Sequence, residues 1–186
     1  MNVGFAMCGS FCTFSQVFPI MELLSRDYLV TPIFSDAAYS TDTRFGKAAD
    51  HIELAEEICR ISPIHTIVQA EPIGPKKLFD ILVIAPCTGN TLAKLAHGIA
   101  DGPVTMAVKS HLRNGRPVLI AVSTNDALNT AAEKIGKLMA KKHYYFVPFR
   151  QDDPGNKPCS MVADFCKIPK ALEAALEGRQ FQPVIL

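Results

Sequence analysis

The chain alternates short apolar runs with longer amphipathic stretches along most of its length. Largely apolar runs of strand length occur at Asn2–Met7, Leu29–Phe34, Ile81–Ala85 and Pro117–Val122, and the third of them is unbroken. Such runs are typical of parallel strands that are buried on both faces. Because strands and helical stretches alternate, we expect an α/β fold with a parallel sheet between two layers of helices.

The intervening stretches carry apolar residues at helical spacing. A proline at position 86 is expected to end the third strand, because proline cannot donate to a ladder. Two more short strands and an extended tail complete the pattern. The predicted helices are Phe14–Leu24, His51–Ile61, a helix beginning after Thr91, Val104–Leu112, Asn129–Lys142 and Pro169–Glu177; the short strands are Ile64–Val68 and Tyr144–Pro148, and the tail is Gln180–Leu186.

Length and composition narrow the class of protein. With 186 residues, 48% of them hydrophobic, we expect a single domain over residues 1–186. The net charge of +1 and the scattered basic residues argue against a nucleic-acid partner or an anionic membrane surface. No segment is apolar enough to span a bilayer, and the N-terminal segment is interpreted as a strand and not a signal peptide. The six cysteines lack paired metal-ligand spacing, so we expect reduced thiols and no metal.

Small polar residues follow four of the predicted strands. They form the turns Gly9-Ser10, Ser35-Asp36, Thr88-Gly89-Asn90-Thr91 and Ser123-Thr124-Asn125-Asp126. The carboxyl ends of parallel strands lie at one edge of a sheet, so these turns are expected to converge on one crevice. Backbone N–H groups and helix dipoles at such turns favour a phosphate or another anion. The alternative is ordinary strand-to-helix connections with good N-caps.

The third of these turns carries a recognisable signature. Ile84–Asp101, with Pro86, Asn90 and Thr91, resembles the Pro-x-x-x-Asn-Thr segment of the FMN-binding flavoprotein family of cysteine decarboxylases, phosphopantothenoylcysteine decarboxylases and flavin prenyltransferases. The resemblance implies a three-layer flavodoxin-like Rossmann sandwich and a homo-oligomer, a trimer or a multiple of trimers, with FMN at the contacts between its copies. The cofactor-binding residues implied are Gly9, Ser10, Ser35, Pro86, Thr88, Gly89, Asn90, Thr91 and Ser123.

The chain also departs from the decarboxylases of that family. Where they carry a Met-Asn-x-x-Met type segment, this chain has Met106–Arg113 without it. It also lacks a convincing counterpart of the catalytic histidine of the cysteine decarboxylases. These departures weaken a prediction of decarboxylation.

A more specific resemblance runs in order over nearly the whole chain, through the segments Ser40–Lys47, Ala70–Lys76, Leu112–Pro117, Ser123–Asp126, Val147–Pro154 and Ala174–Gly178. These segments resemble the family of dipicolinate synthase B subunits. The resemblance implies joint action with the A subunit of dipicolinate synthase in an NADP-linked oxidation of a dihydrodipicolinate-type intermediate of the lysine pathway, in the cytoplasm of a sporulating mother cell. No Gly-x-Gly-x-x-Gly follows the first strand, so NADP is expected on the partner.

A small dicarboxylate substrate would need a fixed cation and a proton acceptor. Arg44, in the polar loop after the second strand, is the first candidate for pairing with a carboxylate, unless it pairs with Asp42. Arg113 and Arg116 come next. Asp42, Asp126 and Asp152 are the candidate proton acceptors, and Asp126 has the alternative role of capping the helix that follows.

Two other functions stay open on the sequence alone. One is a self-sufficient FMN-dependent decarboxylase or oxidoreductase that acts on a small carboxylic acid. The other is a non-catalytic scaffold that binds a phosphate or nucleotide. Both use the same crevice, and neither requires a partner protein.

Overall fold

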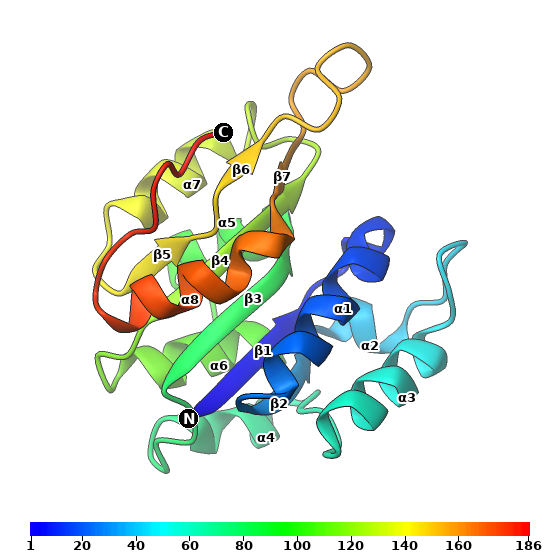
Figure 1. Ribbon diagram of the computed structural model, residues 1–186, viewed down its shortest axis with the longest axis vertical. Helices are drawn as coiled ribbons and strands as arrows, with labels where there is room; N and C mark the ends of the chain where they lie inside the picture. Colours follow the sequence, from blue (N-terminus) through cyan, green and yellow to red (C-terminus); the bar gives the residue numbers. More distant parts are fainter.

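The computed structural model describes residues 1–186, which form one seven-stranded sheet (Figure 1). Its strand order is β2-β1-β3-β4-β7-β6, and β5 also pairs with β4. The strands β1 to β5 are mutually parallel where they pair, whereas β7 is antiparallel to β4 and β6. This confirms the predicted α/β class with a mostly parallel sheet. The strands are β1 Asn2–Met7, β2 Leu29–Phe34, β3 Ile81–Cys87, β4 Val118–Thr124, β5 Tyr144–Phe146, β6 Phe149–Arg150 and β7 Met161–Ala163.

Helices cover both faces of the sheet. In Figure 1, α1 and α8 lie in front of it, while α4 and α6 lie behind it. No helix is both long enough and apolar enough to cross a membrane. The α-helices are α1 Phe14–Ser25, α2 Asp36–Ser40, α3 Ala48–Cys59, α4 Ile67–Ala70, α5 Gly89–His97, α6 Pro103–Leu112, α7 Ala132–Met139 and α8 Ile168–Leu176, and the 3₁₀ turns are η1 Phe11–Thr13, η2 Glu71–Ile73 and η3 Phe165–Lys167.

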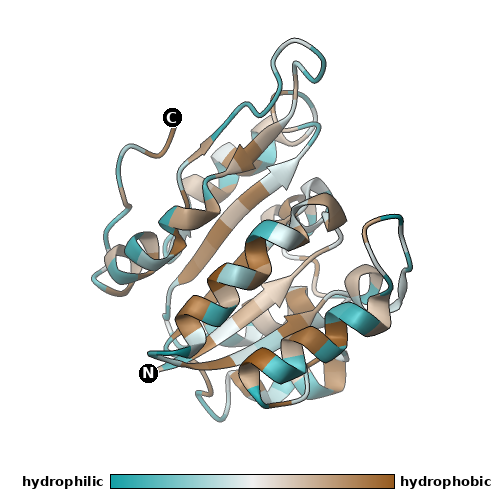
Figure 2. Cartoon of the chain, turned by 45° about the vertical axis from the view of Figure 1, so that its right-hand side comes forward, coloured by the Kyte–Doolittle hydropathy of each residue, from teal (hydrophilic) through white to brown (hydrophobic).

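The hydrophobic core lies on both sides of β1, β3 and β4. Every residue of β3 is buried, and β1 and β4 are buried except at one end. In Figure 2 the central strands are drawn largely in the brown tones of apolar residues. Burial on both faces explains why they are largely apolar runs instead of alternating ones.

The third strand does not end at Pro86, contrary to the prediction. β3 continues to Cys87, which pairs with Val122 after a shift in register. The carbonyl oxygen of Pro86 accepts a hydrogen bond from the N–H of Cys8 at 3.2 Å. Proline lacks only the donor, so its acceptor still ties β3 to the end of β1.

The predicted strand Ile64–Val68 is wrong. Only Ile64 pairs, as a single bridge to Ile33, and the chain then enters α4. Thr66 caps that helix, with Gln69 completing a capping box. The hydrogen bonds of this capping box favour a helical turn over the strand suggested by the β-branched residues.

The sequence also failed to predict the hairpin of β6 and β7, and the predicted strand Tyr144–Pro148 ends earlier, at Phe146. Strands of two or three residues are too short to show a hydrophobic period. The hairpin extends the sheet at its carboxyl edge, where β7 pairs with Ser123 and Thr124 of β4.

Candidate functional site

A polar hollow of about 760 Å³ lies at the carboxyl ends of β1, β3 and β4. A smaller one of about 370 Å³ adjoins it and reaches Ser35 and Gly102. The two share Gly9, Thr88 and Asn90 as lining residues, and together we call them the crevice. The chain passes from β1 to β2 on one side and on to β3 on the other, so the crevice lies at the switch in strand order, where α/β sheets bind ligands.

The first and fourth polar turns meet directly. The hydroxyl oxygens of Ser10 and Ser123 are 2.8 Å apart, although the residues are 113 positions apart in sequence. Ser10 is fixed further by Thr13, whose hydroxyl donates to the carbonyl oxygen of Ser10 at 2.8 Å. The convergence predicted for these turns is therefore present, with hydroxyl groups facing the crevice.

The third turn begins α5. The Thr88 hydroxyl oxygen accepts from the N–H of Thr91 at 3.3 Å and is the N-cap of that helix. Thr91 is buried, and its hydroxyl donates to Cys8 Sγ at 3.3 Å. Asn90 lines both hollows. Of the second turn, Ser35 lines the smaller hollow, and its hydroxyl caps α2 by accepting from the N–H of Ala38.

Gly89 lets a carboxylate approach the start of α5. A Cβ at this position would lie 2.6 Å from Asp126 Oδ1 and 2.8 Å from Thr124 Oγ1. Thr124 donates to Asp126 at 2.5 Å, which holds that carboxylate over the helix N-terminus, where a negative charge is favourable. Asp126 does not cap the helix that follows, because α7 begins at Ala132 without a side-chain cap.

Five predicted residues lie outside the crevice lining: Asp42, Arg44, Pro86, Arg113 and Arg116, the last of which pairs with Asp80 at 3.4 Å. Asp42 Oδ1 accepts from the N–H of Ala48 at 2.9 Å and so closes the start of α3. Arg44 does not pair with Asp42; its guanidinium lies 4.8 Å from the ring centroid of Phe45. Phe45, not Arg44, lines the larger hollow. Pro86 is buried within β3 and lines neither hollow.

The hairpin loop brings to the crevice Asp152, one of the predicted proton acceptors, and Lys157, which sequence reasoning missed. Lys157 is the cation that lines the larger hollow, and its Nζ lies 3.4 Å from Asp152 Oδ2. Partial burial raises the pKa of Asp152, but hydrogen bonds from Ser160, its own backbone and Lys157 outweigh that effect and hold the pKa below its ordinary value. The charged residues of the loop around Pro154 were a usable signal, although only the fold brings the loop to the crevice.

The thiols beneath the crevice are not nucleophiles. Burial raises the pKa of Cys8 to about 11, although its hydrogen bond from Thr91 opposes the shift. Burial also raises the pKa of Cys87 well above its ordinary value. Both thiols are therefore protonated near neutral pH. Cys12, in contrast, is exposed and lines the larger hollow.

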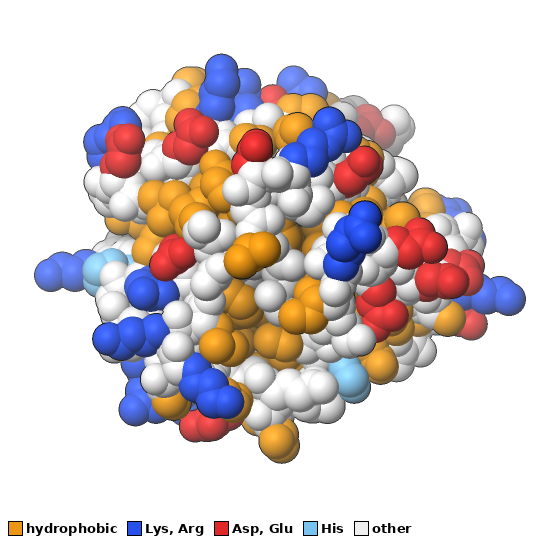
Figure 3. Space-filling model, turned by 60° about the horizontal axis from the view of Figure 1, so that its bottom comes forward, with side chains coloured by type: hydrophobic (Ala, Val, Ile, Leu, Met, Phe, Trp, Pro, Cys, Tyr) orange, Lys and Arg blue, Asp and Glu red, His pale blue; other side chains and the backbone are white.

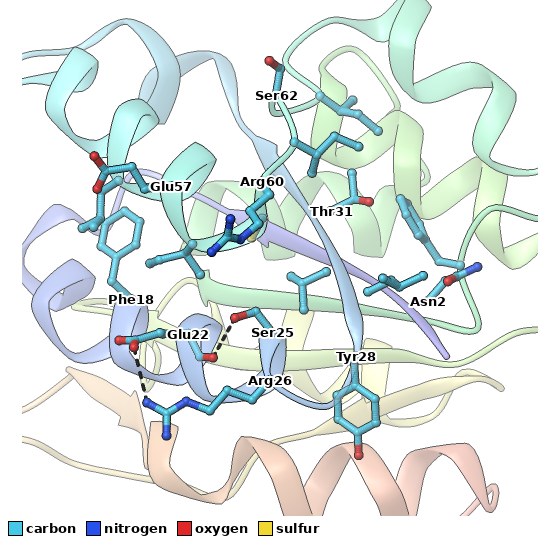
Figure 4. A pocket seen from close by; sticks show the side chains of 18 of the residues that line it. Asn2, Phe18, Glu22, Ser25, Arg26, Tyr28, Thr31, Glu57, Arg60 and Ser62 are labelled. Carbon is cyan, nitrogen blue, oxygen red and sulfur yellow. Dashed lines mark hydrogen bonds and ion pairs between the residues drawn. The ribbon is translucent and has the colours of Figure 1, made fainter.

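A more voluminous hollow, of about 1370 Å³, lies elsewhere, beside the outer edge of β2 between α1 and α3 (Figure 4). Its lining is mainly apolar, and at its rim Arg26 pairs with Glu22 at 3.3 Å. Figure 3 shows apolar side chains gathered over this end of the molecule. It lies toward the start of β1 and β2, away from the polar turns, so we place the candidate site in the crevice.

A sheet with this strand order and a hydroxyl-lined crevice at its switch point is typical of flavodoxin-like proteins. The chain belongs to the Flavoprotein family, whose family model matches residues 1–167. It is 44% identical, over all of its length and 93% of the relative's, to the B subunit of dipicolinate synthase from Bacillus subtilis.

Solved structures agree with this assignment. The B subunit of dipicolinate synthase from Bacillus halodurans matches with a TM-score of 0.91 and 45% identity, covering 100% of this chain and 95% of that one. The FMN-dependent cysteine decarboxylase SpaF matches with a TM-score of 0.72 and 21% identity, over 95% of each chain. The first shows a close relative, and the second shows the shared fold.

The crevice fits an FMN molecule. The volume of its larger hollow, about 760 Å³, lies within the roughly 300–1,000 Å³ of small-molecule pockets. Its hydroxyls and the turn after β1 match a phosphate and a polyol chain, which neutral donors bind well. Because residue 9 is a glycine, no side chain crowds that turn. A Cβ at this position would lie 3.3 Å from the ring of Phe11. Ser10, Ser35, Thr88, Asn90 and Ser123 are the residues that would hold the group.

Proposed function

We propose that this chain is the B component of a two-component dipicolinate synthase. The observation that carries the proposal is the 44% identity over the full chain to a protein of that description. The hydroxyl-lined crevice at the switch point supports it as the place where a flavin and a small dicarboxylate would bind. In this proposal NADP binds to the A subunit.

The reaction converts a dihydropyridine dicarboxylate to the aromatic pyridine. It removes one hydride, which NADP⁺ accepts, and one proton, which a base accepts. FMN, when bound, supplies a ring that can take up and release a hydride. Asp126 is our candidate for the proton acceptor, because its carboxylate lines the crevice and Thr124 fixes its orientation.

Substrate carboxylates need a cation, and Lys157 is the cation that lines the larger hollow. An ammonium group on a flexible stem can turn from Asp152 to a bound carboxylate. Arg44 remains our candidate for the second carboxylate, reached from the loop that carries Phe45. The two cations stand on different loops, which suits a substrate with carboxylates on both sides of its ring.

Reconstitution tests this function. The chain, the A subunit that belongs with it, NADP⁺ and the dihydrodipicolinate-type intermediate are combined, and the ultraviolet absorbance of dipicolinate is followed with and without FMN. We expect product only when both proteins are present. Equal rates when this chain is left out would contradict a catalytic role for it, and product when the A subunit is left out would favour a self-sufficient enzyme.

Alkylation of Cys12 tests whether FMN binds in the crevice. Cys12 lines the crevice, whereas Cys166 is also exposed but does not line it. Bound FMN is expected to slow iodoacetamide labelling of Cys12 severalfold while Cys166 reacts at an unchanged rate, as measured by mass spectrometry. If both cysteines react at unchanged rates in saturating FMN, the cofactor does not bind at this site.

A further inference from the structure

The loop between α2 and α3 carries a rigid aromatic tip at the mouth of the crevice. We infer that Phe45 and Arg44 together recognise a planar ring bearing a carboxylate, with Phe45 packing on the ring and Arg44 pairing with the carboxylate. This inference rests on the proposed function, and it assigns Phe45 as the residue that contacts the ring of the dicarboxylate substrate.

The tip is a tight turn in which Thr43 and Gly46 form two backbone hydrogen bonds with each other. The N–H of Thr43 donates to the carbonyl oxygen of Gly46 at 3.0 Å, and the N–H of Gly46 donates back to the carbonyl oxygen of Thr43 at 3.2 Å. The Thr43 hydroxyl also accepts from the N–H of Phe45 at 3.1 Å. Arg44 and Phe45 are therefore the two central residues of a hydrogen-bonded turn, and their side chains project from a fixed backbone.

The turn is also anchored to the body of the protein. Gly46 has a φ of 138° and rests on the imidazole of His51, where a Cβ would lie 2.6 Å from Nε2. His51 is 8% exposed, and its ring centroid lies 4.9 Å from that of Phe14. Asp42 holds the other side of the turn through its bond to Ala48. The tip is thus preorganised before any ligand arrives, which lowers the entropic cost of binding.

The chemistry of the tip matches one class of ligand. Phe45 is 46% exposed although it lines the hollow, so one part of its ring is available to a flat partner. Aromatic rings attract each other in offset or edge-to-face contacts. The Arg44 guanidinium already lies over Phe45 at 4.8 Å, and its planar fork binds a carboxylate with two parallel hydrogen bonds. A pyridine carboxylate offers both partners at once.

Substitutions in the tip test the inference, with pyridine-2,6-dicarboxylate as the probe. Calorimetry is done on the complex reconstituted with the A subunit. We expect Phe45→Ala to weaken binding of the probe about fivefold and Arg44→Gln about tenfold or more, while Phe45→Tyr retains affinity. Saturated piperidine-2,6-dicarboxylate, which has no flat ring, should bind Phe45→Ala and the unchanged protein equally.

A fluorescence measurement keeps the test independent of folding defects. The chain has no tryptophan, so Phe45→Trp creates a single reporter at the tip. Leu29→Trp is the matched control, because Leu29 is 74% exposed and lies at the hollow beside β2. The probe is expected to quench the first reporter and leave the second unchanged.

The outcomes separate this inference from the proposed function. If the complex makes dipicolinate but the tip variants bind the probe as tightly as the unchanged protein, the inference is wrong and the function stands. If no dipicolinate forms while the tip variants lose affinity for the probe, the inference stands without the function. Failure of the unchanged complex to bind the probe overturns the inference.

Discussion

At the scale of single residues, Gly89 governs how the crevice is assembled. Its missing side chain lets the Asp126 carboxylate lie over the start of α5, within the space that a Cβ would take. Thr124 fixes that carboxylate from the other side. In the proposed function this carboxylate is the proton acceptor, whereas the sequence alone presents Asp126 only as one of several loop aspartates.

Gly89→Ala should reduce function without unfolding the protein. The new Cβ meets only the ends of two side chains, so Asp126 can move aside, and we expect at least a tenfold loss of the dipicolinate rate in the reconstituted complex. The control is Gly136→Ala, whose Cβ has no neighbour within 4 Å and which should stabilise α7 by about 1 kcal/mol. Unchanged activity of Gly89→Ala would exclude a role for the position of Asp126.

At the scale of elements, the first turn of α5 contacts both the hydrophobic core and the crevice. Its N-cap Thr88 lines both hollows, and its inward side places Thr91 on the buried thiol of Cys8. The hydrogen bonds that begin the helix therefore also fix the floor of the crevice. At α2, too, the N-cap residue is a lining residue, because Ser35 lines the smaller hollow.

Thr88→Val should destabilise the protein by about 1 kcal/mol, because the shape is kept while the acceptor for the N–H of Thr91 is lost. Thr88→Ser keeps that acceptor and should stay within about 0.5 kcal/mol of the unchanged protein. Urea unfolding monitored by circular dichroism measures both. Equal stabilities of the valine and serine variants would show that the cap contributes nothing to folding.

At the scale of the whole molecule, stability should depend on pH through His111. This residue of α6 is 1% exposed, its Nε2 lies 3.1 Å from the carbonyl oxygen of Pro117, and its Nδ1 is buried without a partner. Burial lowers its pKa to about 4, although the hydrogen bond to Pro117 opposes that shift. The folded protein therefore keeps His111 neutral at pH values where an unfolded chain would protonate it.

Because the unfolded state takes up the extra proton, the contribution of His111 is complete above about pH 6.5 and is lost as the pH falls toward 4, by about 3 kcal/mol. His111→Gln, which keeps a donor for Pro117, should flatten this part of the stability curve in urea unfolding at several pH values. His97→Gln is the control, since His97 is exposed. A slope that persists unchanged in His111→Gln would assign the pH dependence to other groups.

Much of the sheet and part of the site could be predicted from the sequence. The strands β1, β2 and β4 were found to within about two residues, because burial on both faces leaves an apolar run that needs no tertiary information. The polar turns after β1, β3 and β4 were expected to converge, and the contact of Ser10 with Ser123 confirms it for the first and last of them. Strand β3 was located but ended too early, because the carbonyl group of Pro86 can still accept a hydrogen bond.

The sequence by itself determined the layer architecture and the edge of the sheet where the crevice lies, since both follow from local hydrophobic period and from the direction of parallel strands. Only the tertiary structure decided which charged and aromatic side chains reach that crevice. Lys157 and Phe45 come from loops whose path depends on long-range contacts, the hairpin on β4 and the turn on His51. Such contacts depend on how separate elements pack in space, so they produce no hydrophobic periodicity in the sequence from which they could be predicted.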